Sequence, residues 1–228
     1  MSQPPLPPGQ VESAQFPRFG LSQFAQRLPK TPGEIRVAIG GNVQHPLTVG
    51  TDFKRLTRVH QQSDFHCVTT WSCRSLQWSG FRFADFYRYF ALPMAGVDPQ
   101  ASFVVLSGLD GYRASLPLAD LLAPDVLLAD RLGGEPLSMA HGAPLRLVAP
   151  AHYGYKSVKC IKGVEFLCSD ADYRPIGSSF MSHPRARVAD EERGQWLPGW
   201  LLRYLYRPLV RPTIARFERV SGEQPAQT

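Results

Sequence analysis

Proline and glycine interrupt this chain so often that long regular elements have little room to form. There are 21 prolines and 19 glycines among 228 residues, about one residue in six. Proline lacks a backbone donor and glycine favours turns, so both residues punctuate secondary structure. The composition therefore predicts many turns and short elements rather than a helical bundle.

Short runs between these breakers alternate apolar and polar residues, as strands do. We expect strands within 33–41, 59–68, 103–106, 126–130, 143–150 and 157–167. Apolar residues at helical spacing predict short helices within 52–56, 83–90 and 117–122. The expected fold class is α+β, with mixed sheets and short helices.

The length suits one sizeable domain, which can bury roughly 70% of the surface that its unfolded chain exposes. With 43% apolar and 19% charged residues, the chain is excluded from the disordered class. We divide it into a flexible proline-rich lead-in at 1–15, a domain at 16–180 and a basic aromatic tail at 181–228. The net charge of +6 allows nucleic acid, acidic membrane or a phosphorylated ligand as partner, and selects none of them.

The N-terminal sequence does not have the pattern of an export signal. The first ten residues contain four prolines and no apolar run, and no stretch approaches the ~18–20 apolar residues of a spanning helix. We therefore expect a cytoplasmic protein. Four cysteines form no C-x-x-C pair, and reduced thiols are expected at Cys67, Cys73, Cys160 and Cys168.

The commonest catalytic motifs are absent. We find no G-x-x-x-x-G-K-[ST], G-x-G-x-x-G, H-E-x-x-H or G-x-S-x-G pattern. A cysteine hydrolase would need a base for Cys67, but His66 is its neighbour on an expected strand, where adjacent side chains point to opposite faces. A thiol at the end of a strand and a glycine turn among lysines remain to be explained.

Three segments carrying these features resemble one family. The stretch DFHCVTTWSCRSLQWSGFRFADF (64–86) resembles the molybdenum-ligand segment of molybdopterin-dependent oxidoreductases of the sulfite oxidase family. It is most similar to the branch with the bacterial methionine sulfoxide reductase catalytic subunit. The stretch HGAPLRLVAPAHYGYKSVKCIKGVEF (141–166) resembles the cofactor-binding segment of that family, and FPRFG (16–20) resembles a segment that lies against the pterin. The resemblance covers 16–180 and implies a sulfite-oxidase-type molybdopterin-binding domain.

The resemblance also implies site residues. Cys67 would be the molybdenum ligand, and Tyr173 would be the catalytic tyrosine near the oxo group. Contacts to the pterin and its phosphate would come from Arg18, Ser107 or its neighbour Gly108, His141, Arg146, Ser157, Val158 and Lys159. The chemistry suits these assignments, because a thiolate is a strong soft donor and arginine and lysine bind phosphate.

Alternatives exist for several of these residues. Cys67 could be an ordinary buried cysteine, the reading that we assign to the other three thiols. Tyr173 could pack its ring and expose its hydroxyl. Lys156 and Lys162 are expected at the solvated surface.

The resemblance predicts a molybdenum-cofactor oxidoreductase that performs two-electron chemistry, oxygen-atom transfer above all, on a small substrate. An external electron-transfer protein is then required, and a membrane-bound haem protein is one candidate. Sulfite itself is disfavoured, because Val68-Thr69-Thr70 follows the cysteine where sulfite oxidases have a run containing a substrate-binding arginine. The rival hypotheses are a non-catalytic binding module with the same fold and a basic nucleic-acid-binding domain, which we disfavour.

The tail has a composition of its own. The stretch 196–217 has four arginines and no acid, and its tryptophan, tyrosine and leucine residues have helical spacing. Pro208 and Pro212 should kink or end the helix. Two readings stay open, which are docking to a membrane surface or a membrane-bound partner, and a helix that packs on its own domain.

Overall fold

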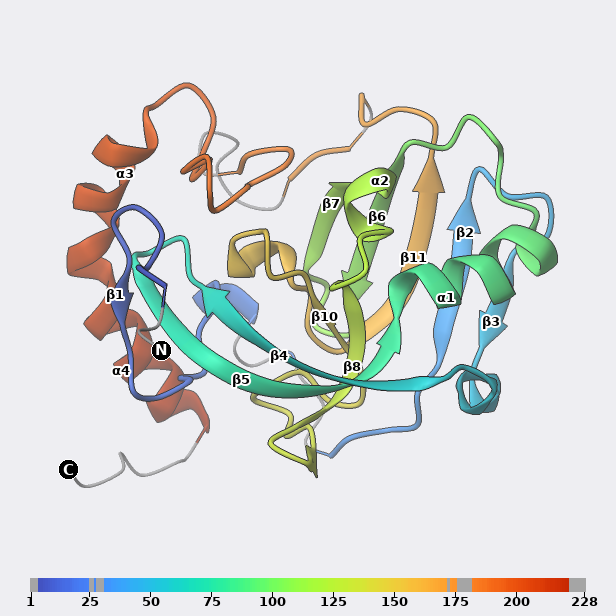
Figure 1. Cartoon of the computed structure of the whole chain (residues 1–228), viewed down its shortest axis with the longest axis horizontal. Helices are drawn as coiled ribbons and strands as arrows, with labels where there is room; N and C mark the ends of the chain where they lie inside the picture. Colours follow the sequence, from blue (N-terminus) through green and yellow to red (C-terminus); the bar gives the residue numbers. More distant parts are fainter. Residues whose placement is uncertain (1–3, 25–26, 28–30, 172, 176–181, 222–228) are drawn as a thin grey trace.

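Two β-sheets and a few short helices form the architecture of the chain (Figure 1). The computed structural model describes residues 4–24, 27, 31–171, 173–175 and 182–221. Within this part of the chain, no helix is long and apolar enough to cross a membrane. The α+β class with mixed sheets and short helices is confirmed.

The first sheet is organised by one long strand, β5, which pairs with three others. It lies parallel to β1 and antiparallel to β4 and β8, while β8 in turn pairs with β9 and β10. The strands are β1 (Val11–Glu12), β4 (Arg58–His66), β5 (Trp71–Arg82), β8 (Leu127–Leu132), β9 (Glu135–Pro136) and β10 (Arg146–Val148). In Figure 1, β4 and β5 form a long curved hairpin that runs along the molecule.

The second sheet has the strand order β3-β2-β11-β6-β7. Its only parallel pair is β2 with β11, and the other neighbours are antiparallel. The strands are β2 (Val37–Gly41), β3 (Leu47–Val49), β6 (Phe103–Gly108), β7 (Arg113–Pro117) and β11 (Ile161–Leu167). In each sheet, neighbouring strands therefore include pairs that lie far apart in the sequence.

The main core lies where the second sheet meets the end of β5 and the helix that follows it. Phe83, Phe86 and Phe90 are fully buried at helical spacing, and the ring of Phe86 stacks on Phe53 with centroids 5.7 Å apart. These residues belong to α1 (Phe83–Phe86) and to the π-helix η3 (Tyr87–Ala95), and Phe53 to the short helix η2 (Thr51–Arg55). The remaining short helices of the domain are η1 (Ser22–Phe24), α2 (Leu118–Leu121) and η4 (Gly154–Lys156).

Three sequence-based boundaries differ from the structure. The lead-in is not wholly flexible, because Val11–Glu12 forms β1 and pairs with β5. The strand expected at 157–167 begins only at Ile161, since the chain turns before it and Cys160 has a φ of +51°. The sequence also did not predict the long strand β5 at Trp71–Arg82, after the segment with Cys67. The domain limits at 15 and 180 stay predictions, and residue 180 lies outside the described residues.

The tail folds into α3 (Gly199–Tyr206), the short helix η6 (Arg207–Leu209) and α4 (Val210–Ser221). Pro208 falls where the helix tightens, and Pro212 falls in the first turn of α4, where a missing N–H is tolerated. One side of these helices packs against the domain, since Leu202, Tyr206 and Phe217 are buried. On that side, the tail helices therefore pack on their own domain, which is one of the two readings left open by the sequence.

This packing can be tested with two leucines of α3. Leu202 is fully buried and Leu205 is 55% exposed. We expect Leu202→Ala to destabilise the docked tail by about 2–5 kcal/mol, and Leu205→Ala to change stability by no more than about 0.5 kcal/mol. Limited proteolysis of the tail and thermal unfolding would measure both. Equal susceptibility of the two variants would contradict the docked arrangement.

Candidate functional site

Cys67 lies in the tight turn that joins β4 to β5. The turn is closed by hydrogen bonds from the Cys67 amide to the Trp71 carbonyl (2.8 Å) and from the Thr70 amide to the Cys67 carbonyl (3.1 Å). The Cys67 side chain is almost fully buried, and its sulfur lies 3.1 Å from the Thr69 hydroxyl. Burial raises the pKa of the thiol to about 11, so it keeps its proton at neutral pH unless a cation displaces it.

The N-terminal segment holds one side of this turn. The Gln10 side chain donates to the Cys67 carbonyl at 3.1 Å, and the Val11 amide donates to the Thr70 carbonyl at 2.8 Å. Gln10 is oriented in turn by the Ser72 hydroxyl, which donates to its amide oxygen at 2.9 Å. A segment expected to be a flexible lead-in therefore positions the cysteine.

A residue of the C-terminal tail, Arg193, holds the other side of the turn. Arg193 is fully buried and donates to the carbonyls of Val68 (2.6 Å) and Pro8 (2.9 Å). It also forms an ion pair with Glu191 at 3.2 Å. These contacts join the N-terminal segment, the cysteine turn and the segment before α3 at one guanidinium.

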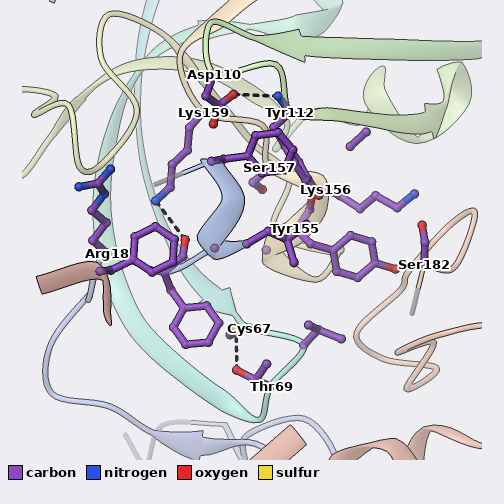
Figure 2. A pocket seen from close by; sticks show the side chains of 18 of the residues that line it. Arg18, Cys67, Thr69, Asp110, Tyr112, Tyr155, Lys156, Ser157, Lys159 and Ser182 are labelled. Atoms are coloured by element: carbon purple, nitrogen blue, oxygen red, sulfur yellow. Dashed lines mark hydrogen bonds between the residues drawn. The ribbon is translucent and has the colours of Figure 1, made fainter. Parts of the chain in front are cut away.

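A cavity of about 430 Å³ opens beside Cys67 (Figure 2). That volume lies within the range of small-molecule sites. Its walls come from 16–24, the cysteine turn, the β6–β7 connection, the turn at 154–159, and Tyr206 and Phe217 of the tail. Gly154 permits the tight packing of one wall, because a Cβ at this position would overlap the ring of Phe65.

The cavity is lined by more positive than negative side chains. Arg18, Arg113, Lys156 and Lys159 line it together with one acid, Asp110. Burial raises the pKa of Asp110, because the charged form of this carboxyl is disfavoured away from water. The balance of charge favours an anionic ligand.

Lys159 reaches across the cavity (Figure 2). Its ammonium donates to the carbonyls of Ala140 (2.9 Å) and Phe19 (3.3 Å). Burial, with the neighbouring charges of Arg146 and Arg18, lowers the pKa of Lys159 to about 7. An anion in the cavity would reverse this effect, because it favours the charged form.

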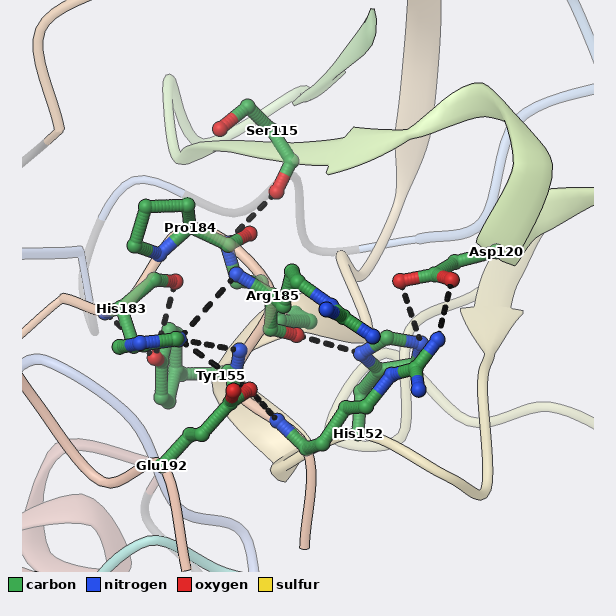
Figure 3. Close-up of polar contacts among 11 residues, drawn as sticks. Ser115, Asp120, His152, Tyr155, His183, Pro184, Arg185 and Glu192 are labelled. Atoms are coloured by element: carbon green, nitrogen blue, oxygen red, sulfur yellow. Dashed lines mark hydrogen bonds and ion pairs between the residues drawn. The ribbon is translucent and has the colours of Figure 1, made fainter. Parts of the chain in front are cut away.

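Lys156 is buried, so the surface position expected from the sequence is wrong. Its ammonium donates to the carbonyls of Ser115 (2.7 Å) and Pro184 (2.8 Å), and burial lowers its pKa to about 7. Figure 3 shows Ser115 and Pro184 beside a polar network in which His183 contacts Glu192 and His152 contacts Asp120. Because the segment at 182–193 folds back over Lys156, the lysine is covered. Lys162 is exposed, as expected.

Arg146 lies behind the cavity wall. It is fully buried and donates to the His141 carbonyl at 2.9 Å. Its guanidinium lies 5.7 Å from the ring centroids of Phe16 and Phe65, and both of these rings line the cavity. Its Nη2 atom has no hydrogen-bond partner among the described residues. Burial lowers its pKa to about 10, so it remains charged at neutral pH.

His141 supports the same wall. Its Nε2 lies 3.0 Å from the Phe16 carbonyl and its Nδ1 2.9 Å from the Ser138 hydroxyl, and its ring stacks on Phe16. A carbonyl only accepts, so Nε2 carries the proton and Nδ1 accepts from Ser138. His141 therefore orients the segment that was expected to lie against the pterin.

The other predicted residues separate into two groups. Arg18, Ser157 and Tyr173 line the cavity with Cys67 and Lys159. The Tyr173 hydroxyl donates to the Arg113 carbonyl at 3.2 Å, and burial raises its pKa. Ser107 and Val158 are buried but do not line the cavity; Ser107 lies 3.5 Å from the Gly163 carbonyl, and Val158 belongs to the main core. Gly108, the alternative to Ser107, does not line it either.

Several cavity residues were missed by the sequence analysis. Asp110 and Tyr112 follow a short strand, and Tyr155 precedes Lys156. The glycines beside them predict turns, and no motif marked these three residues as part of a site. Tyr206 and Phe217 arrive from the tail, which sequence reasoning treated as separate. Arg193 sits in an acidic run, and no pattern there pointed to the cysteine turn.

The residues present fit a molybdopterin cofactor. The cavity offers a soft sulfur donor beside a surplus of cations, and Arg146 behind it has a buried donor without a partner. An anionic pterin phosphate would supply the missing negative charge, and a metal would displace the thiol proton. Within the described ranges, no three His, Cys, Asp or Glu side chains gather into a metal-binding cluster.

Comparison with known proteins agrees with this fit. Residues 25–174 match the family model described as "Oxidoreductase molybdopterin binding domain". The chain is 36% identical to the uncharacterized oxidoreductase YuiH of Bacillus subtilis over 162 residues, which covers 71% of this chain and 78% of the relative. It is 29% identical to the MsrP catalytic subunit of the protein-methionine-sulfoxide reductase of Xanthomonas axonopodis pv. citri, covering 75% of this chain and 60% of the relative.

Two further comparisons cover smaller shares of the matched proteins. The mitochondrial sulfite oxidase of Drosophila melanogaster is 30% identical over 64% of this chain but only 24% of its own length. The crystal structure of the sulfane dehydrogenase SoxCD from Paracoccus pantotrophus superposes with a TM-score of 0.52 at 23% identity, covering 67% of this chain and 43% of that one. That similarity concerns the fold alone.

The two buried lysines predict a pH-dependent stability for protein that carries no anion. Burial lowers the pKa of Lys156 and Lys159 from an ordinary 10.5 to about 7. Above pH 7 the unfolded chain therefore binds more protons than the native one, and the free energy of unfolding rises with pH. We expect an increase of about 1–3 kcal/mol between about pH 6.5 and pH 8.

Urea unfolding across this range would measure the increase. The double variant Lys156→Met/Lys159→Met should flatten the profile, whereas Lys162→Met, an exposed lysine nearby, should leave it unchanged. A stability that falls over the same interval would contradict the assignment.

Proposed function

This chain belongs to the molybdopterin-binding oxidoreductase family, and on that premise we propose that Cys67 is the molybdenum ligand of an enzyme that transfers an oxygen atom to or from a small substrate. The family makes the chain an oxidoreductase with a molybdenum–molybdopterin cofactor. The observation that carries the finer proposal is the position of Cys67, a buried thiol facing a cavity that is lined mainly by cations.

The bound molybdenum would supply the two-electron chemistry, while the protein supplies binding, orientation and electrostatics. Cys67 would give its thiolate to the metal, and its high pKa in the absence of a cation means that proton release accompanies ligation. The turn carbonyls held by Gln10 and Arg193 fix where the sulfur points. The protein's contribution is therefore the orientation of one donor.

The phosphate of the cofactor would lie near Lys159 and Ser157. Lys159 keeps its proton in the presence of an anion, and Arg18 adds a second charge from the facing segment. Arg146 and His141 act on this region through Phe16, whose ring and carbonyl they contact. Tyr173 lines the same cavity and would offer its hydroxyl to the substrate side.

Substrate and electron partner belong to the proposal as well. The chain spans 60% of the methionine-sulfoxide reductase subunit and 24% of the sulfite oxidase that it matches, so neither named activity transfers directly. Sulfite is disfavoured by the Val68-Thr69-Thr70 run after the cysteine. An external electron-transfer protein, with a membrane-bound haem protein as one candidate, would exchange electrons with the metal. A cytoplasmic location stays a prediction.

The role of Cys67 can be separated from that of an ordinary buried thiol. We expect Cys67→Ser to retain most of the pterin but to lower turnover by about 100-fold or more. Mutation of a residue that only hydrogen-bonds to a metal ligand already lowers metal affinity or activity by about 10–100-fold. Cys73→Ser is the matched control, since Cys73 is equally buried on β5 and does not line the cavity. Turnover would be followed with sulfoxides, N-oxides and sulfite using dye donors and acceptors, beside molybdenum and pterin analysis. Full activity of Cys67→Ser, or absence of molybdenum from protein produced with ample cofactor, would refute the proposal.

The role of Lys159 is tested by cofactor retention. We expect Lys159→Met to lower the pterin content by about tenfold or more, because a charge-assisted hydrogen bond to phosphate is lost. The cofactor-free fold should be as stable as before or more stable, since a buried cation is replaced by an apolar chain. Lys162→Met serves as the exposed control. Normal pterin content in Lys159→Met would exclude a phosphate contact at this residue.

A further inference from the structure

α3 and the residues that flank it expose an unusual number of large apolar side chains. Of twelve large hydrophobic residues exposed in the described part of the chain, six fall within 196–209. They are Trp196 (81% exposed), Leu197, Trp200, Tyr204, Leu205 and Leu209. Clusters of this kind mark interaction sites, whereas single exposed hydrophobic residues do not.

This exposure is not a sign of a loosely placed helix. Leu202 and Tyr206, on the inner side of α3, are buried against the domain. Trp200 and Tyr204 are four residues apart and lie on the side of the helix opposite to Leu202. Figure 1 shows α3 at the left edge of the molecule, with its outer side turned away from both sheets. The apolar side is thus available while the other side is anchored.

Positive charge accompanies the apolar side chains. Arg207 and Arg211 are exposed directly after α3, and 196–217 contains no acidic residue. Arg203 is partly used by an ion pair with Glu191 at 3.7 Å. Tryptophan and tyrosine prefer the boundary between lipid headgroups and acyl chains, and arginines beside them attract anionic headgroups.

We propose that the exposed surface of α3 and its flanking residues, defined as Trp196, Trp200, Tyr204, Leu205, Leu209, Arg207 and Arg211, docks this protein on an anionic lipid bilayer. A bilayer fits better than a protein partner, because the surface is confined to one short helix and its flank. A stable protein interface uses about 20–30 residues on each side, whereas binding to a headgroup layer depends on the apolar area that enters it and on attraction to anionic lipids. The proposal is independent of the reaction at Cys67.

The test uses the full chain with its cofactor and two kinds of vesicle. One contains phosphatidylcholine alone, and the other contains phosphatidylcholine mixed with phosphatidylserine. We expect co-sedimentation with the anionic vesicles and a blue shift of tryptophan fluorescence on binding. Trp200→Ser/Leu205→Ser should weaken the partition coefficient by about tenfold or more, and Arg207→Gln/Arg211→Gln should abolish the preference for phosphatidylserine.

The matched control is Tyr89→Ser/Leu92→Ser on η3. Tyr89 and Leu92 are 64% and 47% exposed, and Figure 1 shows this helix at the opposite end of the molecule from α3. This variant should bind vesicles like the original chain, and circular dichroism should show that all variants are folded. Failure of the original chain to bind anionic vesicles would overturn the proposal and leave the surface to a protein partner. Binding that is unaffected by Trp200→Ser/Leu205→Ser and disappears with salt would also overturn it, as attraction by net charge alone.

Discussion

The turn between β4 and β5 depends on hydrogen bonds from both ends of the chain. Its carbonyls are buried and must find donors, because an unpaired buried carbonyl is costly. Gln10 and Val11 supply them from the N-terminal side and Arg193 from the segment before α3. All three lie outside residues 25–174, the part that matches the family model. The flanking segments are thus part of the machinery that aims the cysteine, rather than additions to a finished domain.

The cavity poses a different problem, because more cationic than acidic side chains line it. Lys156 and Lys159 each donate to two carbonyls, yet Lys159 feels the charge of Arg146 in a desolvated region. Such an arrangement is unfavourable in the protein alone and becomes favourable when an anion enters. The phosphate contact that we propose at Lys159 would relieve this repulsion, so anion binding and the loss of the electrostatic penalty would coincide.

The fold brings together several residues that the sequence motifs singled out, whereas the segments around them were predicted less well. Cys67, Arg18, Ser157 and Lys159 share one cavity because their motifs are local, and a local motif constrains a turn strongly. Ser107 lies outside the cavity lining because its position depends on the register between β6 and β11, which a single strand does not encode. Lys156 fails because a distant segment covers it. The long strand β5 was missed since its Ser, Cys, Arg and Gln residues lack a clear alternation, and pairing on both sides stabilises it instead.

One wall of the cavity is made by Tyr206 and Phe217, which belong to helices at the far end of the described chain. A ribosome synthesises every other wall first, and domains fold as the chain emerges. The cavity therefore remains open on that side until residue 217 has been made and α4 has docked, with Phe217 against Arg18. The last wall of the cavity is thus added after all the others, when α4 packs against the segment that carries Arg18.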